Sequence, residues 1–220
     1  MEYLVFAFHT NQNTPLNTEI WLKEIEALSE ALSIPTKKVS YVLSNKKDKF
    51  GDLRRHQQKL ITAKDADLSS VCIYGSRSDS CDALNFESYF DVTRRLNLVV
   101  LSAQVGLAND SFTIRPILRA VENAVGGLSN IIYGYSYKRF LKRGAILYSY
   151  GLIQGLDLRS KIDLLERESI TKWSQDGIHK MGYEKGLVRS FFSINLFSSS
   201  HLRAIEEIKQ KTGLDLFSYG

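Results

Sequence analysis

The chain has 220 residues, 44% of them hydrophobic and 24% charged, and a formal net charge of +5. These values are typical of a globular protein with a sizeable core, and they exclude an intrinsically disordered chain. The 2 cysteines exclude a disulfide-rich scaffold, and the apolar runs are strand-sized, far below the ~20 residues of a membrane helix.

The cysteines and the N-terminus indicate a compartment. Cys72 and Cys81 can pair across a loop, but we expect two free thiols in a reducing cytoplasm. The stretch MEYLVFAFHTNQN lacks the basic region and the small-residue cleavage site of a signal peptide. We therefore expect a cytoplasmic protein.

The first 44 residues predict a strand, a helix and a second strand. The apolar run EYLVFAFHT, residues 2–10, is typical of a buried strand. Asn17 or Thr18 can cap a helix whose hydrophobic residues recur every three or four positions, and Pro35 prevents its continuation. Val39–Ser44 then predicts the second strand.

Residues 45–105 predict further strands. The segment NKKDKFGD is typical of a turn, and Leu53–Ala63 fits either a helix or an extended edge. A polar loop is expected over Ser76–Asp82. The strands predicted in this part are Ser69–Gly75, Ser88–Thr93 and Leu96–Gln104.

The second half begins with a helix over Phe112–Val125. Asp110 or Ser111 can cap it, Pro116 is tolerated in its first turn, and the following Gly-Gly pair ends it. The elements predicted after it are strands over Asn130–Tyr137, Ala145–Ile153, Leu187–Phe197 and Leu214–Ser218, and helices over Ser160–Ser174 and Ser199–Thr212.

This order of elements predicts an α+β fold. We expect two abutting mixed α/β subdomains, residues 1–105 and 106–220, with mainly antiparallel sheets and helices packed on them. No Pro-rich or Gly/Ser-rich linker separates the halves, so one compact domain remains the alternative.

The sequence lacks the patterns of catalytic and metal sites. The 4 histidines are scattered without ligand spacing, and neither a nucleophile elbow nor a Gly-rich phosphate loop is present. We expect no catalytic residue, no metal and no cofactor. The enzymatic alternative requires His9, Asp79 and Asp82 to converge in one cleft.

Positive charge is concentrated in residues 37–64, which contain nine Lys and Arg and two Asp and so carry a net charge of +7. In a second basic stretch, YGYSYKRFLKR, tyrosines at alternate positions precede the basic residues. Basic and aromatic side chains can contact an acidic protein or a nucleic acid. The competing interpretation is a solvated loop followed by a charged helix.

The C-terminal half resembles a known class of proteins. The phrase GLVRSFFSINLFSSSHL and the upstream pair YGYSY and YSYGLI are similar to segments of immunity proteins encoded beside bacterial polymorphic toxins of type VI or contact-dependent secretion systems. The matching positions are Gly134, Gly151, Gly186, Arg189, Asn195, Leu196, His201 and Leu202. Arg189 and Asn195 are either partner contacts or structural residues.

The resemblance implies a protein that neutralises a cognate toxin by direct, non-catalytic binding and occlusion of its active site. We expect no membrane contact, and the oligomeric state stays open. The predicted partner-binding residues are Lys46, Lys47, Lys49, Arg54, Arg55, Tyr135, Tyr137, Lys138, Arg139, Lys142 and Arg143. The alternative is a nucleic-acid-binding module that uses residues 37–64.

Overall fold

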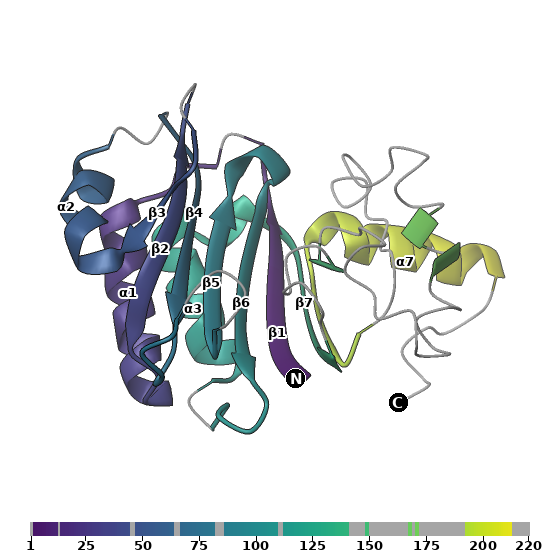
Figure 1. Ribbon diagram of the computed structural model, residues 1–220. Helices are drawn as coiled ribbons and strands as arrows, with labels where there is room; N and C mark the ends of the chain where they lie inside the picture. The colour runs from purple at the N-terminus through teal and green to yellow at the C-terminus, as the bar shows by residue number, and fades with distance from the viewer. Residues whose placement is uncertain are drawn as a thin grey trace.

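The computed structural model describes residues 2–12, 14–44, 47–63, 67–81, 86–109, 112–140, 148–149, 167–168, 170–171 and 192–212. These residues form an eight-stranded antiparallel sheet in the order β3-β2-β4-β5-β6-β1-β7-β8, together with four α-helices (Figure 1). The strands are β1 (Glu2–Thr10), β2 (Thr36–Leu43), β3 (Lys49–Asp52), β4 (Leu68–Gly75), β5 (Ser88–Thr93), β6 (Leu98–Gln104), β7 (Ile131–Phe140) and β8 (Ile194–Phe197). The helices are α1 (Thr18–Leu32), α2 (Leu53–Thr62), α3 (Ile114–Val125) and α7 (Ser199–Thr212). The predicted α+β class is confirmed.

The first strand and helix form as predicted. β1 lies between β6 and β7, so both of its edges are paired and its run of apolar residues is buried. The side chain of Asn17 accepts a hydrogen bond from the backbone N–H of Ile20 and caps α1. Ser33 ends the helix in the left-handed conformation.

The two faces of the sheet carry different side chains. On one face, α1 and α3 pack over alternate strand residues, and Phe6, Trp21, Ile25, Phe90 and Val121 belong to this core. The residues that point to the other face are rich in tyrosine: Tyr3, Tyr74, Tyr89, Tyr133, Tyr135 and Tyr137. Side chains alternate between the faces because the period of a strand is two residues.

At three places the structure corrects or completes the local predictions. Lys49–Asp52, predicted as part of a turn, forms β3 and pairs with β2. Leu53–Thr62 is a helix, which resolves the open alternative. The residue before α3 is Thr113, and its side chain makes no capping hydrogen bond, whereas the predicted caps Asp110 and Ser111 lie outside the described residues.

Much of the predicted C-terminal half lies outside the described residues, including Leu214–Ser218. Of the predicted strand Ala145–Ile153, the two described residues, Tyr148 and Ser149, are helical. β7 and β8 continue the sheet that β1 belongs to, and the division at residue 105 stays a prediction. Of the described helices, none has the length and apolar character needed to cross a bilayer.

Candidate partner-binding surface

The basic segment of the sequence forms one outer end of the sheet. β3 pairs with β2, placing Phe50 opposite Ser40, and α2 follows directly. Leu60 is the buried residue of α2, so the basic side chains of this short helix face solvent. Lys47, Lys49, Phe50, Arg54 and Arg55 are all exposed, and we call them the β3 surface. Lys46 lies outside the described residues.

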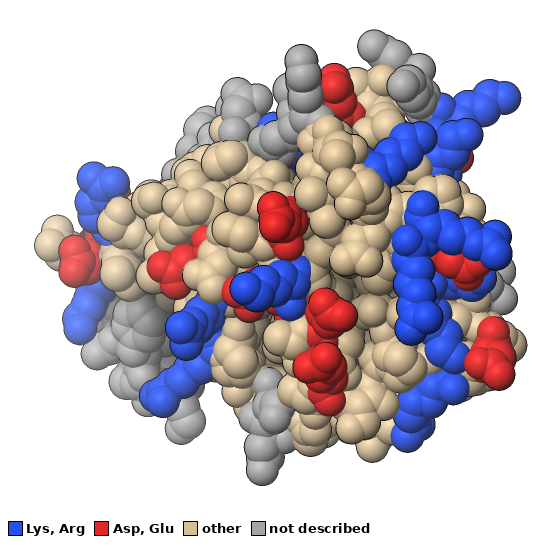
Figure 2. All heavy atoms as spheres, turned by 90° about the vertical axis from the view of Figure 1, so that its left-hand side faces the viewer, with Lys and Arg blue, Asp and Glu red and all other residues tan. Residues whose placement is uncertain are grey.

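Most of the positive charge of the β3 surface is not neutralised locally. Asp52 forms an ion pair with Lys38 and lies 3.6 Å from Arg55 Nε. The hydrogen bond from Lys38, together with its charge, lowers the pKa of Asp52. Lys47, Lys49 and Arg54 form no ion pair with any described residue. Figure 2 views the molecule from this end and shows Lys and Arg side chains reaching into solvent, with acidic side chains between them.

The second predicted group of contacts, on β7, is different. Tyr135 and Tyr137 are 0% and 5% exposed, so their prediction as partner contacts is wrong: they are core residues. Both hydroxyls bond to Ser149, and Tyr135 stacks on Phe192 with ring centroids 4.3 Å apart. Alternate positions of β7 do not reach solvent here, because both faces of the sheet are covered at this strand.

The basic residues predicted on and after β7 differ in their exposure. Lys138 is exposed, but Arg139 is half-buried, donates a hydrogen bond to the hydroxyl of Tyr148 and lies 4.6 Å from the centre of its ring. Lys142 and Arg143 lie outside the described residues. Five strands separate β3 from β7, which places the two groups about 29 Å apart. The predicted residues therefore do not form one continuous patch.

Asn195, one of the positions that carry the family resemblance, has a structural role. Its Oδ1 accepts hydrogen bonds from the hydroxyl of Tyr133 (2.8 Å) and from the backbone N–H of Phe192 (3.2 Å). Its Nδ2 donates to the carbonyl oxygen of Phe192 (2.7 Å). The side chain thus fixes the turn that leads into β8 and ties this turn to β7.

We expect Asn195→Ala to destabilise the fold by about 1–3 kcal/mol, because the three hydrogen bonds of the Asn195 side chain are lost in a partly buried site. The control is Asn123→Ala, which removes one exposed hydrogen bond to Glu24 and should cost about 0.5 kcal/mol or less. Urea unfolding of both variants measures the difference. Equal losses would contradict this role of Asn195.

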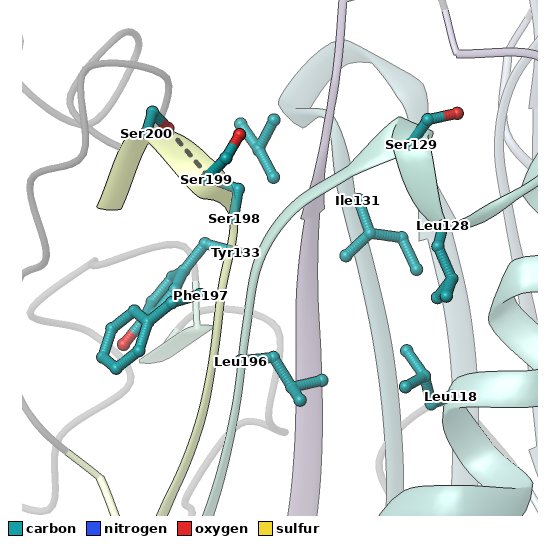
Figure 3. Close-up of a pocket in the computed structure, with 11 residues that line it drawn as sticks. Leu118, Leu128, Ser129, Ile131, Tyr133, Leu196, Phe197, Ser198, Ser199 and Ser200 are labelled. Atoms are coloured by element: carbon teal, nitrogen blue, oxygen red, sulfur yellow. Dashed lines mark hydrogen bonds between the residues drawn. The ribbon is translucent and has the colours of Figure 1, made fainter. Parts of the chain in front are cut away.

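A groove of about 610 Å³ lies at the opposite end of the sheet from the β3 surface (Figure 3). Of the apolar side chains that line it, those of Leu118, Leu128, Ile131 and Leu196 point toward one another, and serines 198–200 border the groove. No charged residue is among those described as lining the groove. No local sequence pattern marks this groove, because its walls come from α3, the residues that follow it, β7, β8 and the start of α7.

Two of the three residues that the enzymatic alternative brings together, His9 and Asp79, lie far apart in the structure. His9 is buried at the end of β1, whereas Asp79 is an exposed loop residue paired with Lys37 at the opposite end of the strands. Asp82 lies outside the described residues. The hydroxyl of Ser198 lies 2.8 Å from Nδ1 of His201. These residues are three positions apart at the start of α7, so this contact belongs to the helix cap.

One acidic side chain is unusual. Asp91 on β5 is 3% exposed and lies opposite Cys72 of β4, and its carboxylate accepts a hydrogen bond from Thr93. Burial raises the pKa of Asp91 to about 7. Burial also raises the pKa values of Cys72 and Tyr89, and the charge of Asp91 adds to both shifts. Cys72 and Cys81 are both buried, and neither is part of a disulfide.

The comparisons with known proteins are sparse. No protein-family model matches the chain, and no curated protein matches it. Among solved structures, one described as "Pseudomonas aeruginosa T6SS protein PA0821" is similar at 16% sequence identity and a TM-score of 0.41. The match covers 63% of this chain and 40% of that protein. Similarity at this level assigns neither a family nor a function.

Proposed function

We propose that the chain is an immunity protein that binds a cognate bacterial toxin and occludes its active site without catalysing a reaction. The observation that carries the proposal is the β3 surface, a hydrogen-bonded strand and helix on which Lys47, Lys49 and Arg54 are exposed and form no ion pair with any described residue. A scaffold of this kind provides positive charge and fixed geometry, which raise the rate and the specificity of binding to an acidic protein surface.

The direct test of this proposal is a growth-rescue experiment. The chain is expressed together with the product of the gene immediately upstream, under conditions in which that product stops growth. We expect growth to resume only when the chain is present, and the two purified proteins to migrate as one complex in size-exclusion chromatography. Absence of both rescue and complex would overturn the proposal.

Nucleic-acid binding is the second candidate, because the same basic residues can contact phosphates. Its signature on a single strand is a fall in log K with log salt of about 0.7 per phosphate contact. Asp48 and Asp52 lie within the basic segment and would repel a phosphate backbone. The salt dependence of binding to a single-stranded oligonucleotide therefore separates the two functions.

A further inference from the structure

Phe50 is an exposed aromatic residue in the middle of a charged surface. Its side chain is 48% exposed, and no other described phenylalanine, tyrosine or tryptophan is exposed to this degree. Lys47, Lys49, Arg54 and Arg55 accompany it in the chain and are exposed as well. Burying a phenylalanine ring is favourable by roughly 1.5–3 kcal/mol, so its exposure on a polar strand calls for an explanation.

The ring of Phe50 is held in place before any partner arrives. β3 pairs with β2, with Phe50 opposite Ser40. The ring packs edge-to-face on Tyr74, with centroids 5.9 Å apart and an interplanar angle of 64°. Tyr74 is buried and itself packs against Phe86 and Tyr89. A side chain that is already ordered loses little conformational entropy on binding.

The face of the sheet around Phe50 is open to a partner. Residues 38, 40 and 42 of β2 point to the same face as Phe50, and all three are partly exposed. Leu60 of α2 instead belongs to the core on the opposite face, together with Val39 and Tyr41 of β2. The described helices α1, α2 and α3 therefore leave this part of the sheet accessible.

We infer that Phe50 is the anchor residue of a protein-docking surface and that the partner supplies an apolar pocket bordered by carboxylates. This inference rests on the proposed function, since it identifies the toxin as the partner. An aromatic side chain surrounded by charged residues has the arrangement of an interface centre with a polar rim. The carboxylates of the pocket would meet Lys47, Lys49 and Arg54, which lack ion-pair partners among the described residues.

A protein partner fits this surface better than a nucleic acid does. Single-stranded nucleic acids bind to runs of aromatic side chains along a positively charged groove. Here one exposed ring stands between Asp48 and Asp52, two residues away on either side. An isolated ring suits a single pocket, and interspersed acids suit a protein surface that carries both signs of charge.

The experiment measures binding of the purified chain to the upstream gene product, inactivated by mutation of its active site, by titration calorimetry. Phe50→Ala is expected to raise the Kd by about 30-fold or more, the effect of removing an interface anchor. The matched control is Leu128→Ala, which removes another apolar side chain, 51% exposed, at the opposite end of the sheet. The control should change the Kd less than about 3-fold.

Thermal unfolding of both variants verifies that they remain folded, which the exposure of both side chains favours. If the complex forms and Phe50→Ala binds like Leu128→Ala, the inference is overturned and the proposed function stands. If no complex forms, the inference is overturned, and the proposed function is overturned with it when growth rescue is absent as well. Binding of a 20-nucleotide single strand that Phe50→Ala weakens, without any toxin complex, would replace the protein partner by a nucleic acid.

Discussion

Replacing Asp91 with asparagine is expected to remove a loss of stability that the protein suffers as the pH rises from acid to neutral. An unfolded aspartate has a pKa near 3.8, whereas burial raises the pKa of Asp91 in the fold to about 7. Between these two values the folded state holds a proton that the unfolded state has released. Stability therefore falls as pH increases through this window and is constant above it.

The size of the effect follows from the shift. About three pKa units correspond to about 4 kcal/mol, of which about 3 kcal/mol should be lost between about pH 4.5 and pH 8. Asparagine keeps an oxygen that can accept the hydrogen bond from Thr93 but cannot ionise. The advantage of Asp91→Asn over the natural protein should thus grow by about 3 kcal/mol across this range, whatever the fixed cost of the amide.

Urea unfolding at a series of pH values measures this difference. Asp48→Asn serves as the matched control, because it makes the same substitution at an exposed position. Parallel curves for Asp91→Asn and the natural protein would contradict a neutral, protonated Asp91 at acid pH.

Gly134→Ala is expected to destabilise the protein by about 1–3 kcal/mol through overpacking. Gly134 lies on β7 between Phe8 of β1 and Leu196 of β8. A Cβ atom at this position would stand 2.8 Å from Cδ1 of Phe8 and 3.2 Å from Cδ1 of Leu196. The ring of Phe8 is fully buried, so it cannot move aside without disturbing the core.

Gly106→Ala is the control for this prediction, since a Cβ atom there meets nothing within 4 Å. Its effect should stay within about 0.5 kcal/mol. Thermal and urea unfolding of the two variants give the comparison. A loss in Gly134→Ala no larger than that in Gly106→Ala would show that the contact with Phe8 does not limit this position.

The sequence predicted most of the elements in the first half because their signals are local. The apolar run of β1 and the cap at Asn17 both appear in the structure as expected. β3 was missed because it is only four residues long, KFGD, and its Gly and Asp are typical of turns. Asp91 had a visible signal in the sequence, because an acid between an aromatic and a β-branched residue in a short strand is uncommon.

Only part of the candidate site could be predicted from the sequence. The sequence by itself determined that positive charge gathers in residues 37–64, because charge is a property of the side chains present. Only the tertiary structure decided that Tyr135 and Tyr137 are buried while Phe50 is exposed. The pairing of strands and the cover over each face depend on segments distant in the chain, and no local pattern records which face of a strand those segments will meet.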